Sequence, residues 1–76
     1  MVKVILQGSL ISELTHLQAE SNSPHFDGMT IKDLIEGLEI NYDLIGLIIL
    51  NGVSVLPEAK CYDGSEVRLF PHTIGG

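Results

Sequence analysis

The feature that most constrains the fold is an apolar run followed by a tight turn. Residues 44–50 consist only of Leu, Ile and Gly, which predicts a central strand covered on both faces. Asn51-Gly52 follows directly, and this pair is the strongest short signal for a two-residue hairpin turn in which both φ values are positive. Residues 53–55 are then expected to form the return strand, which Pro57 ends. The middle of the chain therefore predicts a β-hairpin.

One amphipathic helix is predicted to begin after Thr30. From Ile31 onward, apolar residues recur at positions i, i+3, i+4 and i+7, opposite a polar face that carries three acids. Thr30 can cap this helix, and Asp33 three residues later approximates a capping box. Gly37 indicates an early end or tight packing. We expect the apolar stripe to join a core, because lipid binding would require Lys and Arg on the polar face.

The other strands complete an α+β fold. Residues 2–7 alternate in polarity, apart from Ile5 on the polar side, and predict a first strand with one buried face. After a turn through Ser12-Glu13, a second strand is expected at residues 14–20, antiparallel to the first. A turn at Asp63-Gly64 leads into a last strand at residues 66–70. The predicted order is β-β-α-β-β-β, a mixed four- to five-stranded sheet packed on one helix.

The alternation of side chains in the last strand predicts an apolar patch on the open face of this sheet, the face that the helix does not cover. If Val67 and Leu69 pack under the helix, Phe70 points to the opposite face, where Ile5 and alternate residues of 47–50 also lie. An exposed apolar patch on a small domain usually marks a partner site. The alternative is that the loop of residues 10–23 covers these side chains.

Charge and composition exclude several classes of function. Four basic residues stand against ten acidic ones, and the net charge is −6. This balance argues against nucleic-acid binding and favours a basic protein partner. No apolar run approaches the length that crosses a bilayer, and no secretory signal is recognisable, so we expect a cytoplasmic domain without a membrane partner.

Neither a metal site nor a catalytic site is expected. The lone Cys61 can form no internal disulfide, and a buried structural thiol is favoured over a redox or persulfide site. The three histidines, at positions 16, 25 and 72, lack a carboxylate or cysteine at ligand spacing. We therefore expect no bound cofactor and no catalytic residue.

The C-terminal third carries a family resemblance. Asn51-Gly52 after an apolar strand, residues 63–67 opening the last strand, Phe70-Pro71 and the terminal Gly75-Gly76 together resemble the ubiquitin-like sulfur-carrier family. That family includes the small subunit of molybdopterin synthase and the thiamin-thiazole sulfur carrier. The resemblance implies a β-grasp domain over residues 1–70 and a flexible arm over residues 71–76. The spacing from Phe70-Pro71 to the end is more similar to the molybdopterin-synthase branch, although His72 stands where a second proline is usual.

The resemblance implies a stoichiometric carrier rather than an enzyme. An adenylating enzyme would use ATP-Mg to activate the Gly76 carboxylate, a persulfide enzyme would supply sulfur, and an acceptor synthase subunit would take the resulting thiocarboxylate. Ile5 and Phe70 would mark the docking face. The arm would thread into the partner through five residues: Pro71, His72, Thr73, Ile74 and Gly75.

The residue types of the arm suit this role physically. Six extended residues span at most about 20 Å, enough to reach a deep cleft. Glycines without side chains can enter a narrow channel, and Pro71 stiffens the exit from the sheet. Three other roles remain open: a sulfur carrier for thiamin-thiazole synthesis, a ubiquitin-like modifier joined to lysines through the same glycines, and a β-grasp interaction module without sulfur transfer.

Overall fold

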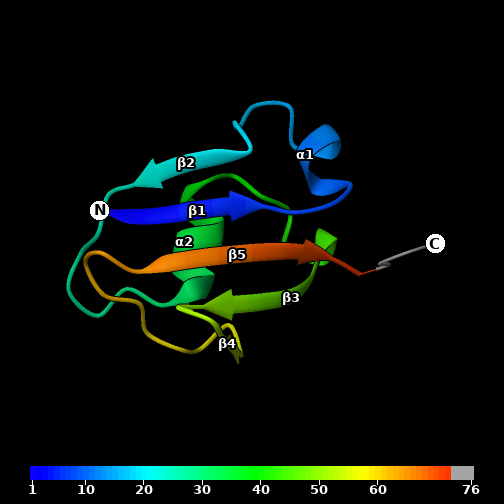
Figure 1. The fold of residues 1–76 in the computed structure, drawn as a ribbon. Coiled ribbons are helices and arrows are strands. Elements are labelled where there is room, and N and C mark those ends of the chain that lie inside the picture. Colours follow the sequence, from blue (N-terminus) through cyan, green and yellow to red (C-terminus); the bar gives the residue numbers. More distant parts are fainter. Residues whose placement is uncertain (73–76) are drawn as a thin grey trace.

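The computed structural model describes residues 1–72, which form a five-stranded mixed sheet with a helix packed on one face (Figure 1). The α+β prediction is confirmed. In space, the strands follow the order β2-β1-β5-β3-β4. The elements along the chain are β1 Val2–Leu6, α1 Leu10–Glu13, β2 Glu20–Ser23, α2 Ile31–Gly37, the 3₁₀ turn η1 Tyr42–Leu44, β3 Ile45–Leu50, β4 Val53–Val55 and β5 Glu66–Pro71.

The first and last strands meet in the middle of the sheet. β1 and β5 run parallel, with Lys3 opposite Glu66 and Leu6 opposite Leu69. β2 pairs antiparallel with the outer side of β1, as predicted for the first two strands, and β3 pairs antiparallel with the other side of β5. β5 is therefore held on both sides along its length.

The core lies between the sheet and α2. Alternate residues of the two central strands are fully buried, and so is the apolar stripe of the helix. Burying a Val, Leu or Ile side chain contributes about 1.5–3 kcal/mol, so this layer supplies most of the stabilisation. The residues that carry it are Val2, Val4, Leu6, Ile31, Leu34, Ile35, Val67 and Leu69.

The prediction for residues 10–20 was wrong. Instead of a turn and a strand, the segment begins with the short helix α1, in which the Leu14 N–H donates to the Leu10 carbonyl at 2.9 Å. Both leucines are buried, so their four-residue spacing follows a helical turn. The second strand starts only at Glu20, which pairs with Ile5. Its residues are all polar, and an edge strand of this kind has no apolar alternation to detect.

The hairpin around β3 is confirmed, but the predicted burial of β3 is wrong. Asn51 and Gly52 have φ values of 49° and 85°, and β4 returns antiparallel over residues 53–55. However, Gly46 and Leu47 are exposed. The fully apolar run suggested a strand covered on both faces, whereas α2 covers only one face of this sheet (Figure 1).

The predicted helix start is confirmed in detail. The Asp33 N–H donates to the Thr30 hydroxyl oxygen at 3.1 Å, and the Thr30 N–H donates to the Asp33 carboxylate at 3.1 Å. These two bonds form a complete capping box. Gly37 is the last residue of α2, which agrees with the early end that it indicated. Among residues 1–72, no helix has the length and apolar content needed to cross a membrane.

Thr30→Ala is expected to lower the free energy of unfolding by about 1 kcal/mol, because it removes the side-chain half of the capping box. Chemical denaturation followed by circular dichroism measures this change. Thr15→Ala, at an exposed position outside the helices and strands, serves as the control and should leave the unfolding free energy nearly unchanged. Equal effects of the two substitutions would contradict a capping role for Thr30.

Candidate functional site

The end of β5 carries the C-terminal segment out of the sheet. β5 continues through Pro71, which pairs with Ile45 and is buried, whereas His72 is exposed. The last strand is therefore one residue longer than the predicted range 66–70, since Pro71 belongs to the sheet. The division into a domain over residues 1–70 and an arm over residues 71–76 stays a prediction. The other predicted tail residues, Thr73, Ile74, Gly75 and Gly76, lie outside the described residues, and their roles stay predictions.

A β-bulge in β3 lies beside this exit. Ile45 pairs with Pro71 and Leu47 with Phe70, so Gly46 is an extra residue on β3 without a counterpart in β5. Sequence reasoning did not single out Gly46. A usable signal was present, because a glycine inside a strand pattern often marks a bulge or a close approach of another backbone.

The sheet face opposite α2 carries the predicted docking residues. Phe70 and Ile5 are both half-buried. Phe70 lies opposite Leu47, which is 36% exposed, and Ile5 lies in a cross-strand row with Arg68 and Ile49. Apolar side chains from the three strands β1, β5 and β3 thus share this face. We call Ile5, Leu47, Ile49 and Phe70 the open-face patch.

Arg68 lies between Ile5 and Ile49 of the open-face patch. The Arg68 Nε lies 3.3 Å from a Glu66 carboxylate oxygen, and both side chains are substantially exposed. Such a surface pair contributes about 0–1 kcal/mol to stability, so it adds little to the fold. It does leave the patch with a polar, hydrogen-bonding centre that a partner can contact.

Two shallow hollows lie on the described surface, one of them at the exit of β5. One has a volume of about 170 Å³ and is lined by Ser9, Glu13, Asp43, Leu44, Pro71 and His72. Its two carboxylates make this side of the exit acidic, which favours a basic partner surface.

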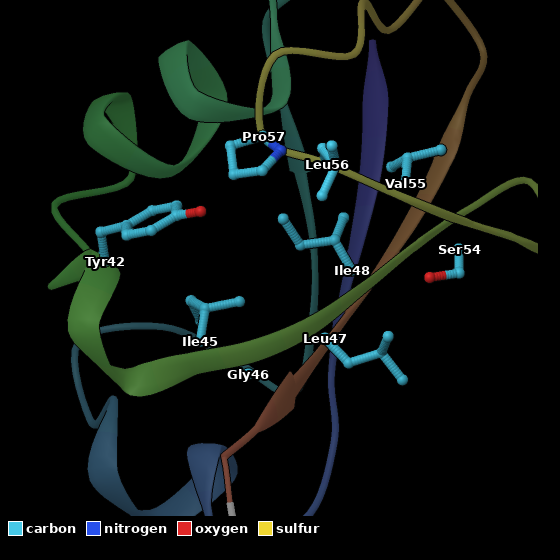
Figure 2. Close-up of a pocket in the computed structure, with 9 residues that line it drawn as sticks. All are labelled: Tyr42, Ile45, Gly46, Leu47, Ile48, Ser54, Val55, Leu56 and Pro57. Carbon is cyan, nitrogen blue, oxygen red and sulfur yellow. The ribbon is translucent and has the colours of Figure 1, made fainter.

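The second hollow, about 200 Å³ in volume, lies between η1, β3 and the segment after β4. Figure 2 shows Tyr42, Ile48 and Leu56 pointing toward it, with Gly46 at its border. Both hollows are smaller than the roughly 300–1,000 Å³ of typical ligand pockets. Neither of these two hollows has the volume that usually encloses a small-molecule ligand.

Two histidines, His16 and His25, form hydrogen bonds with backbone carbonyls. The His16 Nε2–H donates to the Leu38 carbonyl at 3.0 Å, and the His25 Nε2–H donates to the Cys61 carbonyl at 3.1 Å. Within residues 1–72, no three His, Cys, Asp or Glu side chains are grouped closely enough to hold a metal ion. The roles seen for these two histidines are structural.

Cys61 lies in the core. It is 1% exposed, and its thiol contacts the Met29 carbonyl at 3.6 Å. Burial raises the pKa of the Cys61 thiol, because a thiolate would lose its hydration there. The raised pKa and the burial both disfavour reaction at this sulfur.

Comparisons with known proteins agree with this architecture. The sequence profile of the family described as Mut7-C ubiquitin matches residues 10–74. The search of curated proteins found no match.

Two solved structures share the fold. One is described as a molybdopterin converting factor, subunit 1, from Pyrococcus furiosus; it has a TM-score of 0.74 and 21% identity, covering 95% of this chain and 97% of that one. The other is small archaeal modifier protein 1 of H. volcanii, with a TM-score of 0.76 and 17% identity, again covering 95% and 97%. At these identities the likeness concerns the fold alone, and it confirms the predicted β-grasp.

Alkylation of Cys61 by iodoacetamide should be at least about 100-fold slower in the native protein than in denaturant, because reaction requires local opening. Because the thiol reacts from the opened form, where its pKa is the ordinary value of about 8.5, raising the pH should accelerate the reaction in parallel in the native protein and in denaturant, so the ratio of the two rates should stay nearly constant while the fold is intact. Mass spectrometry over time measures the rate.

The control for this measurement is Cys61→Ala/Tyr62→Cys, which moves the thiol to a neighbouring exposed position. Its alkylation should be fast and should rise with pH. Equally fast alkylation of native Cys61 would contradict a purely structural thiol.

Proposed function

Because this chain belongs to the Mut7-C ubiquitin family, we propose that it is a ubiquitin-like sulfur carrier whose Gly76 carboxylate is activated by a partner enzyme. The observation that carries the proposal is the course of β5. This central strand ends at Pro71 beside the open-face patch, and the sequence then runs to Gly75-Gly76. Docking surface and reactive group are thereby joined by a short piece of chain.

The proposed activation is an acyl-adenylation. A terminal carboxylate has a pKa of about 3.3–3.7 and is ionised at neutral pH. One of its oxygens attacks the α-phosphorus of ATP, and the bond to pyrophosphate breaks. Mg²⁺ and the active-site groups for this step belong to the adenylating enzyme, while this chain supplies only the carboxylate and the surface that delivers it.

Sulfur then replaces AMP at the acyl carbon. The terminal sulfur of a protein persulfide attacks, and the bond from carbon to the AMP oxygen breaks. Two thiol equivalents of a reductant then cleave the remaining S–S bond and are themselves oxidised to a disulfide. The product is a thiocarboxylate on Gly76, and the partner protein is released as a thiol. The carrier is consumed stoichiometrically in each cycle and acts as a co-substrate.

The structure limits how far the partner's active site can lie from the sheet. Since Pro71 belongs to β5, the arm begins at His72, and its five residues span at most about 18 Å. The partner must therefore contact the exit of β5 closely. The acidic hollow with Glu13 and Asp43 supports a basic surface at this contact.

The proposed acceptor is a synthase of a molybdenum or tungsten pterin. The Phe70-Pro71 spacing from the end supports this branch, as does the fold shared with a protein described as a molybdopterin converting factor subunit. A carrier for thiamin-thiazole synthesis would use the same chemistry with another acceptor. Since the reaction consumes ATP, we place it in the cytoplasm.

A second candidate is a ubiquitin-like modifier. It is favoured by the fold shared with small archaeal modifier protein 1. Adenylation would be the same, but a lysine amine of a target protein would attack the activated acyl carbon in place of sulfur. The chemical fate of Gly76 therefore separates the two functions.

Incubation with the adenylating enzyme, ATP-Mg and a persulfide donor should increase the mass of the chain by about 16 Da, the difference between sulfur and oxygen. Mass spectrometry of the intact protein and of its C-terminal peptide measures the change. The control is the same chain with one alanine added after Gly76, which should gain no mass. Recovery of Gly76 only in isopeptide linkage would support the modifier, and no change at all would overturn both candidates.

Phe70→Asp should weaken binding to the adenylating enzyme about tenfold or more, because a charge in the open-face patch must lose its hydration on docking. Phe26→Asp is the matched control, since Phe26 is 55% exposed and belongs to the loop between β2 and α2. Figure 1 shows this loop near the N-terminal end of β1, away from the exit of β5.

Titration calorimetry measures both affinities, and circular dichroism follows the fold of both variants. Equal loss of affinity in the two variants would contradict a docking role for the open-face patch. Loss of folding in Phe70→Asp would show that Phe70 is part of the core.

A further inference from the structure

The backbone that leaves the sheet lies directly against Gly46. A Cβ atom built on Gly46 would lie 2.5 Å from the His72 Cα, 2.7 Å from the Pro71 carbonyl oxygen and 2.8 Å from the His72 nitrogen. All three are backbone atoms, so no rotation of a side chain can relieve the overlap. Any residue other than glycine at position 46 would have to displace the exit of β5.

Gly8 approaches the same exit from the side of β1, the second strand that pairs with β5. It follows β1, and its φ of 58° is in the left-handed region that favours glycine. A Cβ atom here would lie 3.3 Å from the Pro71 Cγ. Pro71 and His72 therefore leave the sheet between two glycines, one beside β1 and one within β3.

The requirement at position 46 is one of space, not of backbone conformation. Gly28, Gly52 and Gly64 have positive φ values, and a Cβ atom on any of them would meet nothing within 4 Å. Gly46 shows the opposite combination: its φ is not positive, and the backbone of Pro71 and His72 occupies the space that a Cβ atom would need. The bulge at Gly46 thus brings two backbones closer than side chains would allow.

We propose that Gly46, supported by Gly8, is a positioning residue that sets the direction in which the tail leaves the sheet. The inference rests on the proposed function, since direction matters only if Gly76 must reach a reacting phosphorus. With alanine at position 46, the distance between the new Cβ atom and the His72 Cα would have to grow from 2.5 Å toward 3.4 Å, where ordinary van der Waals contact begins. A misplacement of about 1 Å in a reacting pair can cost about 100-fold in rate.

Gly46→Ala is the test, and Gly37→Ala is its matched control. Gly37 is the last residue of α2, and its φ is not positive. A Cβ atom added there would meet nothing within 4 Å. In the free protein, NMR should show amide shifts confined to the ends of β3 and β5 in Gly46→Ala, with the amides of Val4 and Leu34 unchanged.

The functional measurement is ATP–pyrophosphate exchange catalysed by the adenylating enzyme. Gly46→Ala should lower kcat about 10- to 100-fold and leave KM within about twofold, because the open-face patch still docks while the carboxylate is misdirected. Gly37→Ala should behave like the parent chain.

Three outcomes would overturn the positioning role while leaving the proposed function intact. They are parental exchange by Gly46→Ala, a rise in KM with unchanged kcat, and global unfolding of Gly46→Ala. The last would mean that Gly46 supports the whole sheet and not the exit alone. If the parent chain itself supports no exchange, the proposed function fails and the inference falls with it.

Discussion

The parallel pairing of β1 with β5 is the interaction on which the rest of the structure depends. It joins residues more than sixty positions apart, such as Lys3 and Glu66, so the chain between them must cross over before the two strands can meet. α2 lies in that crossover and covers the buried face of the pair, where Val4 and Val67 have no exposed surface. The closure entropy of this long connection is offset by the apolar area buried beneath the sheet.

The site follows from the central place of β5. A tail that leaves from an edge strand would have a neighbour on one side only, whereas this one leaves between β1 and β3. Gly8 and Gly46 can therefore hold Pro71 and His72 from both sides. Because α2 covers one face, the open-face patch remains available close to the same exit, so the proposed docking and delivery would use adjoining surfaces.

Prediction from sequence succeeded where the signal is local. The Thr30–Asp33 box, the Asn51-Gly52 turn and the alternation in β1 each depend on residues within a few positions of one another. It failed for β2, whose polar residues become a strand only by pairing with β1. It also failed for the burial of β3, since an apolar run does not reveal how many layers will cover it.

The sequence by itself determined the helix with its cap, the hairpin with its turn, and the side of the last strand to which Phe70 points. Only the tertiary structure decided that Pro71 is part of the sheet, that β3 carries a bulge, and that Gly46 gives the exit its space. The reason is physical. Caps, turns and alternation arise between near neighbours in the chain, whereas a bulge and a close backbone approach exist only after strands distant in sequence have been brought together.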